Sequence, residues 1–240
     1  MQVQATNVGS VGVPHWDAFR DTAMGRYLLS REQGFIRRLL SAAPAPQRVL
    51  DVCCCTGRVT LPLRDLVPNV MGLDIDWKAL TLFRARSSGN LAVMADGLHL
   101  PFADGSLDCV VAIQCLEYFD HWRFLEGCNR VLREGGLLVF RSVSRRSYKQ
   151  KLRRLLRRVK PYDPSINLST REVLHAVVQC GFEIEAVEGY NWPPFIADFA
   201  PLSNSSLVWA AALVEEKLQL GRYYGVSPWV LVAARKRSYQ

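Results

Sequence analysis

Short apolar runs alternate with helical segments between residues 48 and 143, and this alternation constrains the fold more than any other feature of the sequence. Apolar runs of this length fit strands that are buried on both faces. Strands separated by helices form a parallel sheet that is covered on both sides. The predicted strands are "RVLDVC" (48–53), "NVMGLDI" (69–75), "LAVMAD" (91–96), "LDCVVAIQ" (107–114) and "GLLVFRSV" (136–143).

Helical segments connect these runs and continue on both sides of them. The stretch "HWDAFRDTAMGRYLLSREQGFIRRLLSAA" predicts two helices ahead of the first strand. In "STREVLHAVVQCGF", Ser169 is the expected N-cap and Gly181 the expected stop. The other predicted helices begin at 57 and occupy 77–86, 121–132, 145–160 and 205–220.

Two more strands are expected near the end of the chain, "FEIEAVEGY" (182–190) and "SPWVLVAARK" (227–236). The helix at 205–220 separates them, so they can pair antiparallel at one side of the sheet. A chain of 240 residues suits one domain with such a sheet at its centre. The expected fold class is therefore α/β.

The composition limits where such a chain works. No apolar run approaches the roughly 20 residues that a membrane span needs, and the N-terminus lacks the basic start and apolar core of a secretory signal. Seven cysteines, an odd number, favour reduced thiols over a disulfide framework. We therefore expect a cytoplasmic protein.

The net charge of +8 comes from one segment, residues 145–160, which holds nine Lys or Arg and no acid. Its leucines follow helical spacing, so one stripe is apolar and the rest is cationic. A helix packed on the domain with a solvated basic face is the first interpretation. The second is a helix at an anionic membrane surface, which would make the protein peripheral to the membrane. Nucleic acid ranks third, because no RNA-binding module accompanies the charge.

Acidic residues occur at three successive strand ends: Asp51, Asp74 and Asp96. In open parallel sheets the ligand crevice lies beyond the carboxyl ends of the strands. Asp74 follows Asp51 by 23 residues, close to the interval of about 20 at which a ribose-binding acid follows a nucleotide turn. A single Asp here would be read as a turn former, but three together predict a nucleoside site.

Four blocks of the sequence resemble the class I S-adenosylmethionine-dependent methyltransferases. They are "VLDVCCCTG", "VMGLDID", "ADGLHLPFADGSLDCVVAIQCLEYF" and "NRVLREGGLLVF", and they cover roughly residues 46–143 in the family's order. The resemblance implies a Rossmann-like seven-stranded mixed sheet with helices on both faces. It also implies S-adenosyl-L-methionine as cofactor and a methyltransferase activity.

The resemblance further implies which residues bind the cofactor. Asp51 holds the family's acidic position, Gly57 holds its last glycine, and Cys53 and Cys55 stand where the first two glycines belong. Asp74 matches the acid that binds the ribose hydroxyls in the family, and Ile75 beside it is expected to pack on adenine. Asp96, with Gly97 next to it, matches the acid that hydrogen-bonds the adenine amino group. Gln114 is expected near the methyl group. Arg26 is a candidate partner of the methionine carboxylate.

The three consecutive cysteines have other interpretations. As metal ligands they are poorly placed, because neighbouring side chains on a strand point to opposite faces and no second pair is present; no metal site is predicted. As redox thiols they lack a resolving partner in the sequence. We favour Cys53 and Cys55 as small residues in glycine positions, with an added Cβ and sulfur near the cofactor.

The methyl acceptor is expected to be a small, partly apolar molecule, aromatic or lipidic. Candidate catalytic residues are Tyr27 in the N-terminal helices and Glu117, Tyr118 and His121 after the fourth strand; relatives often have His at the position of Tyr118. Orientation and desolvation dominate methyl transfer, and a base assists an oxygen or nitrogen acceptor. Aromatic residues that can line an apolar cavity are Tyr190, Trp192, Phe195 and Phe199.

The predicted organisation is a helical cap over 1–45 and a methyltransferase domain over 46–240, with an acceptor-side insertion at about 190–222. The alternatives are a catalytically silent methyltransferase-like binding protein and a methyltransferase that acts on nucleic acid. A nicotinamide-dependent oxidoreductase is weaker, because the turn lacks Gly-x-Gly-x-x-Gly. The sequence does not define the oligomeric state.

Overall fold

A seven-stranded mixed sheet forms the centre of the molecule, in the order β3-β2-β1-β4-β5-β7-β6. The computed structural model describes residues 21–41, 46–67, 69–87, 91–155, 168–192 and 206–238. The α/β fold expected from the sequence is confirmed. The strands are β1 (Val49–Val52), β2 (Val70–Asp74), β3 (Ala92–Met94), β4 (Leu107–Ala112), β5 (Leu132–Val143), β6 (Phe182–Tyr190) and β7 (Trp229–Lys236).

The first five strands are parallel and the last two complete the sheet in antiparallel pairs. β1 pairs with β2 on one side and with β4 on the other, so the strand order reverses between β1 and β4. β7 lies between β5 and β6 and is antiparallel to both. The sequence predicted the antiparallel pairing of β6 with β7 but not the place of β7 beside β5. The reversal beside β1 is the point at which an open parallel sheet forms its ligand crevice.

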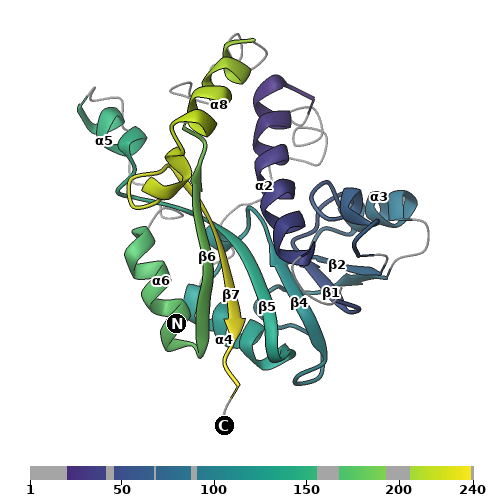
Figure 1. Cartoon of the computed structure of the whole chain (residues 1–240). Coiled ribbons are helices and arrows are strands. Elements are labelled where there is room, and N and C mark those ends of the chain that lie inside the picture. The colour runs from purple at the N-terminus through teal and green to yellow at the C-terminus, as the bar shows by residue number, and fades with distance from the viewer. Residues whose placement is uncertain are drawn as a thin grey trace.

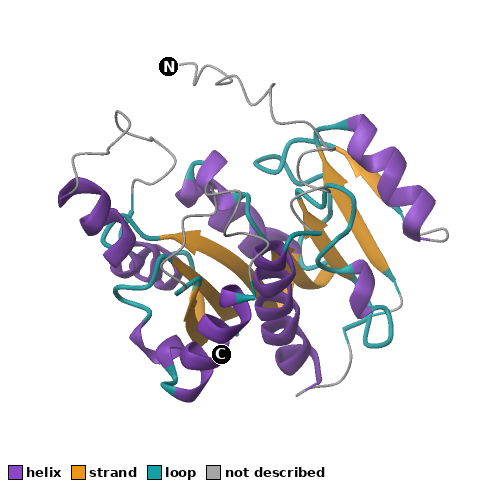
Figure 2. Cartoon of the chain, turned by 90° about the horizontal axis from the view of Figure 1, so that it is seen from above, coloured by secondary structure: helices purple, strands orange, loops and turns teal. Residues whose placement is uncertain are grey.

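Helices cover both faces of the sheet, as Figures 1 and 2 show. α4 (His121–Val131) and α6 (Thr170–Gln179) pack on one face, where their apolar residues join those of the strands in one cluster. α2 (Ala23–Ser41) packs on the other face with α3 (Trp77–Ser87) beside it. β4 supplies both layers, because Cys109 and Val111 face one cluster and Val110 and Ala112 face the other. This alternation makes the strand buried throughout.

Two helices stand above the carboxyl edge of the parallel strands (Figure 1). The structure describes residues 145–155 of the basic segment, and the helix α5 (Tyr148–Leu155) begins three residues later than predicted; residues 156–160 lie outside the described residues. α8 (Leu207–Lys217) is shorter than the predicted helix, and the 3-10 turn η3 (Leu220–Tyr223) follows it. Within the described ranges, no helix combines the length and the apolar character that crossing a membrane requires.

The helix predicted to begin at residue 57 is wrong. That segment forms turns and one short 3-10 helix, η1 (Leu61–Leu63). Pro62 lacks the N–H that an α-helix would use at this point, and Gly57 adopts a φ of +75° that a helix does not allow. Of the two predicted N-terminal helices, the second is α2, whereas the first falls mainly on residues 1–20, outside the described residues.

The predicted ends of α6 are confirmed. The Ser169 hydroxyl accepts from the Glu172 N–H, and the Glu172 carboxylate accepts from the Ser169 N–H at 2.7 Å, which together form a capping box. Gly181 follows the helix with a φ of +84°, a conformation that ends helices and favours glycine.

Candidate active site

Three acidic residues meet at the carboxyl edge of the sheet beside the strand-order reversal. Asp51 belongs to β1, Asp74 ends β2, and Asp96 follows β3. Backbone hydrogen bonds connect these strand ends: the Ala95 N–H donates to the Asp74 carbonyl at 3.2 Å, and the Cys54 N–H donates to the Leu73 carbonyl at 3.0 Å. The structure therefore brings together the three acids that the sequence placed at successive strand ends.

The cysteine turn between β1 and η1 has the backbone of a glycine turn. Cys53 has a φ of 55°, Cys55 of 48° and Gly57 of 75°. Left-handed angles are uncommon for residues with a Cβ, so the two cysteines occupy positions whose conformation favours glycine. Cys54, between them, is 4% exposed, and its sulfur lies over Gly72, where an added Cβ would stand 2.8 Å from it. The seven cysteines of the chain are free thiols.

Asp51 lies below this turn and is almost fully buried. It is 3% exposed, and the Thr60 hydroxyl donates to Oδ2 at 2.5 Å. Burial raises the pKa of Asp51 to about 7, and the negative charge of Asp74 adds to the rise, while the Thr60 hydrogen bond and Arg58 oppose it. The carboxyl group is therefore poised to change its protonation state near neutral pH.

Asp74 is fixed by the backbone on both of its oxygens. Oδ2 accepts from the Cys55 N–H and Oδ1 from the Asp76 N–H, each at 2.9 Å. Partial burial raises its pKa despite these two hydrogen bonds. Each carboxylate oxygen still has a second acceptor site, so the group can bind a further pair of donors. Ile75 beside it is 75% exposed, which leaves its side chain available to a ligand.

Asp96, with Gly97 next to it, is the third acidic residue at this edge of the sheet. Asp96 Oδ1 accepts from the Leu98 N–H at 2.9 Å, and Oδ2 lies 3.1 Å from His99 Nδ1. A Cβ at Gly97 would stand 2.5 Å from the Phe119 ring. The glycine therefore allows the loop after β4 to pack closely on the loop after β3, a reason that the sequence did not reveal.

Gln114, directly after β4, contacts a buried acid that the sequence analysis missed. Gln114 has a φ of 63° and donates through Nε2 to Glu32 Oε1 at 3.0 Å. Glu32 is 0% exposed, and the same oxygen accepts from the Tyr190 hydroxyl at 2.8 Å. Its position in α2 carries a signal, because Leu28, Glu32 and Ile36 follow a spacing of four and share one buried face.

The candidate catalytic residues after β4 have different environments. Glu117 forms an ion pair with Arg141, which was also missed and which is buried at the end of β5. Tyr118 is 57% exposed. His121 begins α4, and burial lowers its pKa although Asp120 and Glu117 oppose the shift. Of these three residues, Glu117 is the one that forms an ion pair with a buried residue, Arg141.

Tyr27 and Arg26 lie in α2 and are already engaged. The Tyr27 hydroxyl donates to Glu215 of α8 and accepts from the Asn191 N–H at 3.1 Å. Burial raises the pKa of Tyr27 and the Glu215 carboxylate raises it further. The Arg26 guanidinium is exposed and donates to the Asp21 carbonyl. The hydrogen bond between Tyr27 and Glu215 thus connects α2 with α8, which gives Tyr27 a structural role separate from catalysis.

Among the aromatic residues predicted to line an acceptor cavity, Tyr190 and Trp192 are described, whereas Phe195 and Phe199 lie outside the described residues. Tyr190 is 0% exposed and meets Trp229 edge-on, with ring centroids 5.5 Å apart. Trp192 stacks on Tyr148 at 5.6 Å. Both aromatic side chains pack at the end of β6, above the carboxyl edge.

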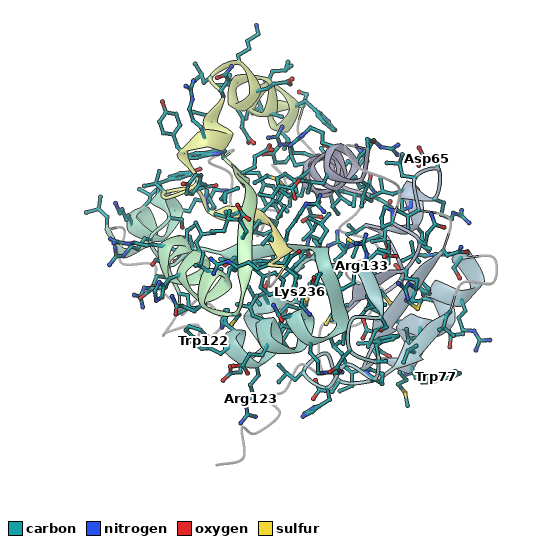
Figure 3. All side chains as sticks on the ribbon, turned by 60° about the horizontal axis from the view of Figure 1, so that its bottom comes forward. Asp65, Trp77, Trp122, Arg123, Arg133 and Lys236 are labelled. Atoms are coloured by element: carbon teal, nitrogen blue, oxygen red, sulfur yellow. The ribbon has the colours of Figure 1, made fainter. Side chains whose placement is uncertain are left out.

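Two cavities lie near the two edges of the sheet. One of about 220 Å³ opens at the cysteine turn and is lined by Thr56, Gly57, Arg58 and Leu29 among others. The second, of about 290 Å³, lies at the opposite edge and includes Arg133 and Arg235. Arg133 and Lys236 lie near each other at this opposite edge (Figure 3), where the Lys236 ammonium donates to the Leu132 carbonyl at 2.8 Å. The first cavity adjoins the candidate site.

The fold defines an α/β protein with three acidic residues at the strand-order reversal, and comparisons with known proteins show which proteins it is similar to. The family described as "Methyltransferase domain" matches residues 50–140. A probable S-adenosylmethionine-dependent methyltransferase of Mycolicibacterium smegmatis is 27% identical over 212 residues, which cover 85% of this chain and 74% of that protein. A demethylmenaquinone methyltransferase of Thermotoga maritima is 35% identical over 97 residues, 39% of this chain and 42% of that one.

Solved structures show the same fold. The magnesium protoporphyrin IX methyltransferase of Synechocystis superposes with a TM-score of 0.69 at 12% identity and 96% coverage of both chains. A methyltransferase of Thermotoga maritima superposes with a TM-score of 0.67 at 19% identity, covering 94% of this chain and 96% of that one. Residues 50–140 thus match a methyltransferase domain, and the whole chain has the fold of class I S-adenosylmethionine-dependent methyltransferases. It is therefore an enzyme whose methyl donor is S-adenosylmethionine, as the resemblance implied.

Proposed function

We propose that the enzyme methylates a small, partly apolar acceptor at the carboxyl edge of β4 and β5, next to a cofactor held by β1, β2 and β3. In this proposal Asp51, Cys53, Cys55 and Gly57 surround the amino-acid end of the cofactor. Asp74 binds the ribose hydroxyls, Ile75 packs on adenine, and Asp96 with Gly97 receives the adenine amino group. Gln114 lies beside the methyl group.

The observation that carries this assignment is the junction of the cysteine turn with Asp74. The Cys55 N–H donates to Asp74 at 2.9 Å, and Cys53, Cys55 and Gly57 share left-handed φ angles. The turn thus keeps a glycine-like path although two thiols replace glycines. Such a path lets a backbone approach a ligand closely, which argues against the silent binding protein as the alternative.

Binding of S-adenosylhomocysteine, the product of the donor, tests the cofactor assignment by calorimetry. We expect the wild type to bind it and Asp74→Asn to bind about 10- to 100-fold more weakly, because hydrogen bonds to a charged group contribute about 1.5–3 kcal/mol. Asp65→Asn is the matched control, since Asp65 is exposed and pairs with Arg37. Equal affinities for all three proteins would contradict the role of Asp74.

A small molecule is the acceptor class favoured by the buried character of the edge beyond Gln114. The side chains of Tyr190, Glu32 and Arg141 there are 0–3% exposed, which suits a compact group more than a polymer. Several relatives carry names of small-molecule methyltransferases, such as the demethylmenaquinone enzyme of Thermotoga maritima. Transfer of labelled methyl groups to the small-molecule fraction of a cell extract, with none to its RNA, is the expected result.

The basic segment supports a second proposal, contact with an anionic membrane. In α5, Leu152 is 46% and Leu155 79% exposed, so much of the apolar surface of both leucines is open to solvent. Basic amphipathic helices of this kind favour anionic lipid. Co-sedimentation with vesicles of phosphatidylcholine and phosphatidylserine should exceed that with phosphatidylcholine alone. Replacing Leu152 and Leu155 with Gln should abolish the difference, and equal partition of the wild type into both vesicles would contradict the proposal.

A further inference from the structure

A cluster of polar side chains that includes Gln114 lies at the carboxyl ends of β4, β5 and β6. It consists of Glu32, Gln114, Glu117, Arg141 and Tyr190, and we call it the Glu32 cluster. Glu32 Oε1 accepts from Gln114 and Tyr190, and Glu117 Oε1 accepts from Arg141. Glu32 Oε2, Glu117 Oε2 and Arg141 Nε are all buried, and none of them has a hydrogen-bond partner in the part of the chain that the structure describes. Among the described residues, two acceptors and one donor therefore stay open at this point.

The five side chains of the cluster also carry more negative than positive charge. Two carboxylates face one guanidinium, which stays charged: burial opposes ionisation, but Glu117, Tyr190 and Glu32 outweigh it and raise the pKa of Arg141. Arg58 of the cysteine turn also acts electrostatically on Tyr190. An unpaired carboxylate oxygen without water is costly in a buried site. The site is therefore complementary to a cationic group with hydrogen-bond donors.

We propose that the Glu32 cluster binds the methyl acceptor through a basic nitrogen, so that the enzyme methylates an amine. The inference rests on the proposed function, which puts the transferred methyl group beside Gln114. An ammonium group offers both a positive charge and several donors, and so matches the open oxygens of Glu32 and Glu117. A carboxylate acceptor would face two like charges, and a neutral hydroxyl would leave the charge unbalanced.

The chemistry of transfer agrees with this charge. Glu32 takes a proton from the bound ammonium, and the freed lone pair of nitrogen attacks the methyl carbon. The new N–C bond forms as the S–C bond breaks, and the electron pair of that bond remains on sulfur. The positive charge passes from the sulfonium to the methylated nitrogen, and the proton stays on Glu32. The Glu117 carboxylate therefore faces a cation both before and after the step.

The test compares matched amines and acids on the protein saturated with S-adenosylhomocysteine at pH 7.5. The probes are tryptamine against indole-3-propionate, benzylamine against benzoate, and octylamine against octanoate, with affinity measured by calorimetry. We expect at least one amine to bind tenfold or more tightly than its acid. Glu32→Gln should reduce that affinity by at least tenfold. The control Glu188→Gln should not, because Glu188 pairs with Arg31 and Arg38 and lies outside the Glu32 cluster.

Glu117→Gln supplies a second variant if Glu32→Gln does not fold, with the same loss expected. The inference is overturned if no amine is preferred over its acid, or if both variants bind the preferred amine as the wild type does. It is also overturned if Glu32→Gln weakens S-adenosylhomocysteine and not the amine, because Glu32 would then serve the cofactor. Failure of the wild type to bind S-adenosylhomocysteine at all would instead refute the proposed function.

Discussion

Replacing Cys55 by Gly and by Ala separates backbone strain from the loss of the thiol. Cys55 has a φ of 48° and is half-buried. Both variants lose the sulfur, but only Ala retains a Cβ in the left-handed region, which costs roughly 1–2 kcal/mol. Glycine avoids this cost, but its unfolded chain has more conformational freedom, which lowers the free energy of unfolding by about 0.5–1 kcal/mol. We therefore expect Cys55→Gly to be more stable than Cys55→Ala by about 0.5–1 kcal/mol.

For a chain of this size that difference raises Tm by about 1–4 °C, which differential scanning calorimetry resolves. Cys128 provides the control, because it is 0% exposed and lies within α4. In a helix the order reverses, and Cys128→Ala should be more stable than Cys128→Gly by about 1 kcal/mol or more. If Ala equals or exceeds Gly at position 55 as it does at position 128, the cysteine turn is not strained and the reasoning fails.

Further predictions concern packing and charge. Gly97→Ala should destabilise the fold by about 1–3 kcal/mol, because its Cβ would meet Phe119, whereas Gly127→Ala in α4, with nothing within 4 Å, should stabilise it by about 0.5–1 kcal/mol; urea unfolding compares the two. Asp51 has a raised pKa of about 7, so the native state binds more protons than the unfolded chain between about pH 4 and 7, and the wild type loses stability as pH rises through that window. Urea unfolding of the wild type and of Asp51→Asn at pH 5 and pH 8 checks this. From pH 5 to pH 8 the urea midpoint of the wild type should fall relative to that of Asp51→Asn. Arg141→Met should cost about 3–5 kcal/mol by leaving Glu117 unpaired, and adding Glu117→Gln should recover part of this loss in urea unfolding.

The strands and the acids at their ends were predictable, because both depend on local sequence. An apolar run of fixed length indicates a buried strand, and Asp51, Asp74 and Asp96 stand at the ends of three such runs. The helix expected at 57 failed because Pro62 and the angle at Gly57 outweighed the apolar residues around them. A prediction that gave more weight to Pro62 would have found the turn.

The Glu32 cluster was not predictable in the same way, because its members come from distant parts of the chain. Glu32 stands in an apolar helical face and Arg141 in an apolar strand, and each is a signal that a charged residue is buried. Neither signal names the partner, since Glu32 and Tyr190 are 158 residues apart. Their pairing follows from the order of the strands in the sheet, which local patterns do not define.

The contacts of α2 also determine when this part of the protein can form during synthesis. Tyr27 bonds to a residue 188 positions later, and Glu32 to one 158 positions later. At about 5–20 residues per second, the ribosome adds the partners of α2 roughly 10–40 s after α2 itself. The contacts of α2 with Arg58 and Asp65 can form early, whereas the buried hydrogen bonds of Tyr27 and Glu32 cannot form until the last third of the chain has been made. The buried side of α2 that carries Tyr27 and Glu32 therefore lacks these two partners during most of synthesis.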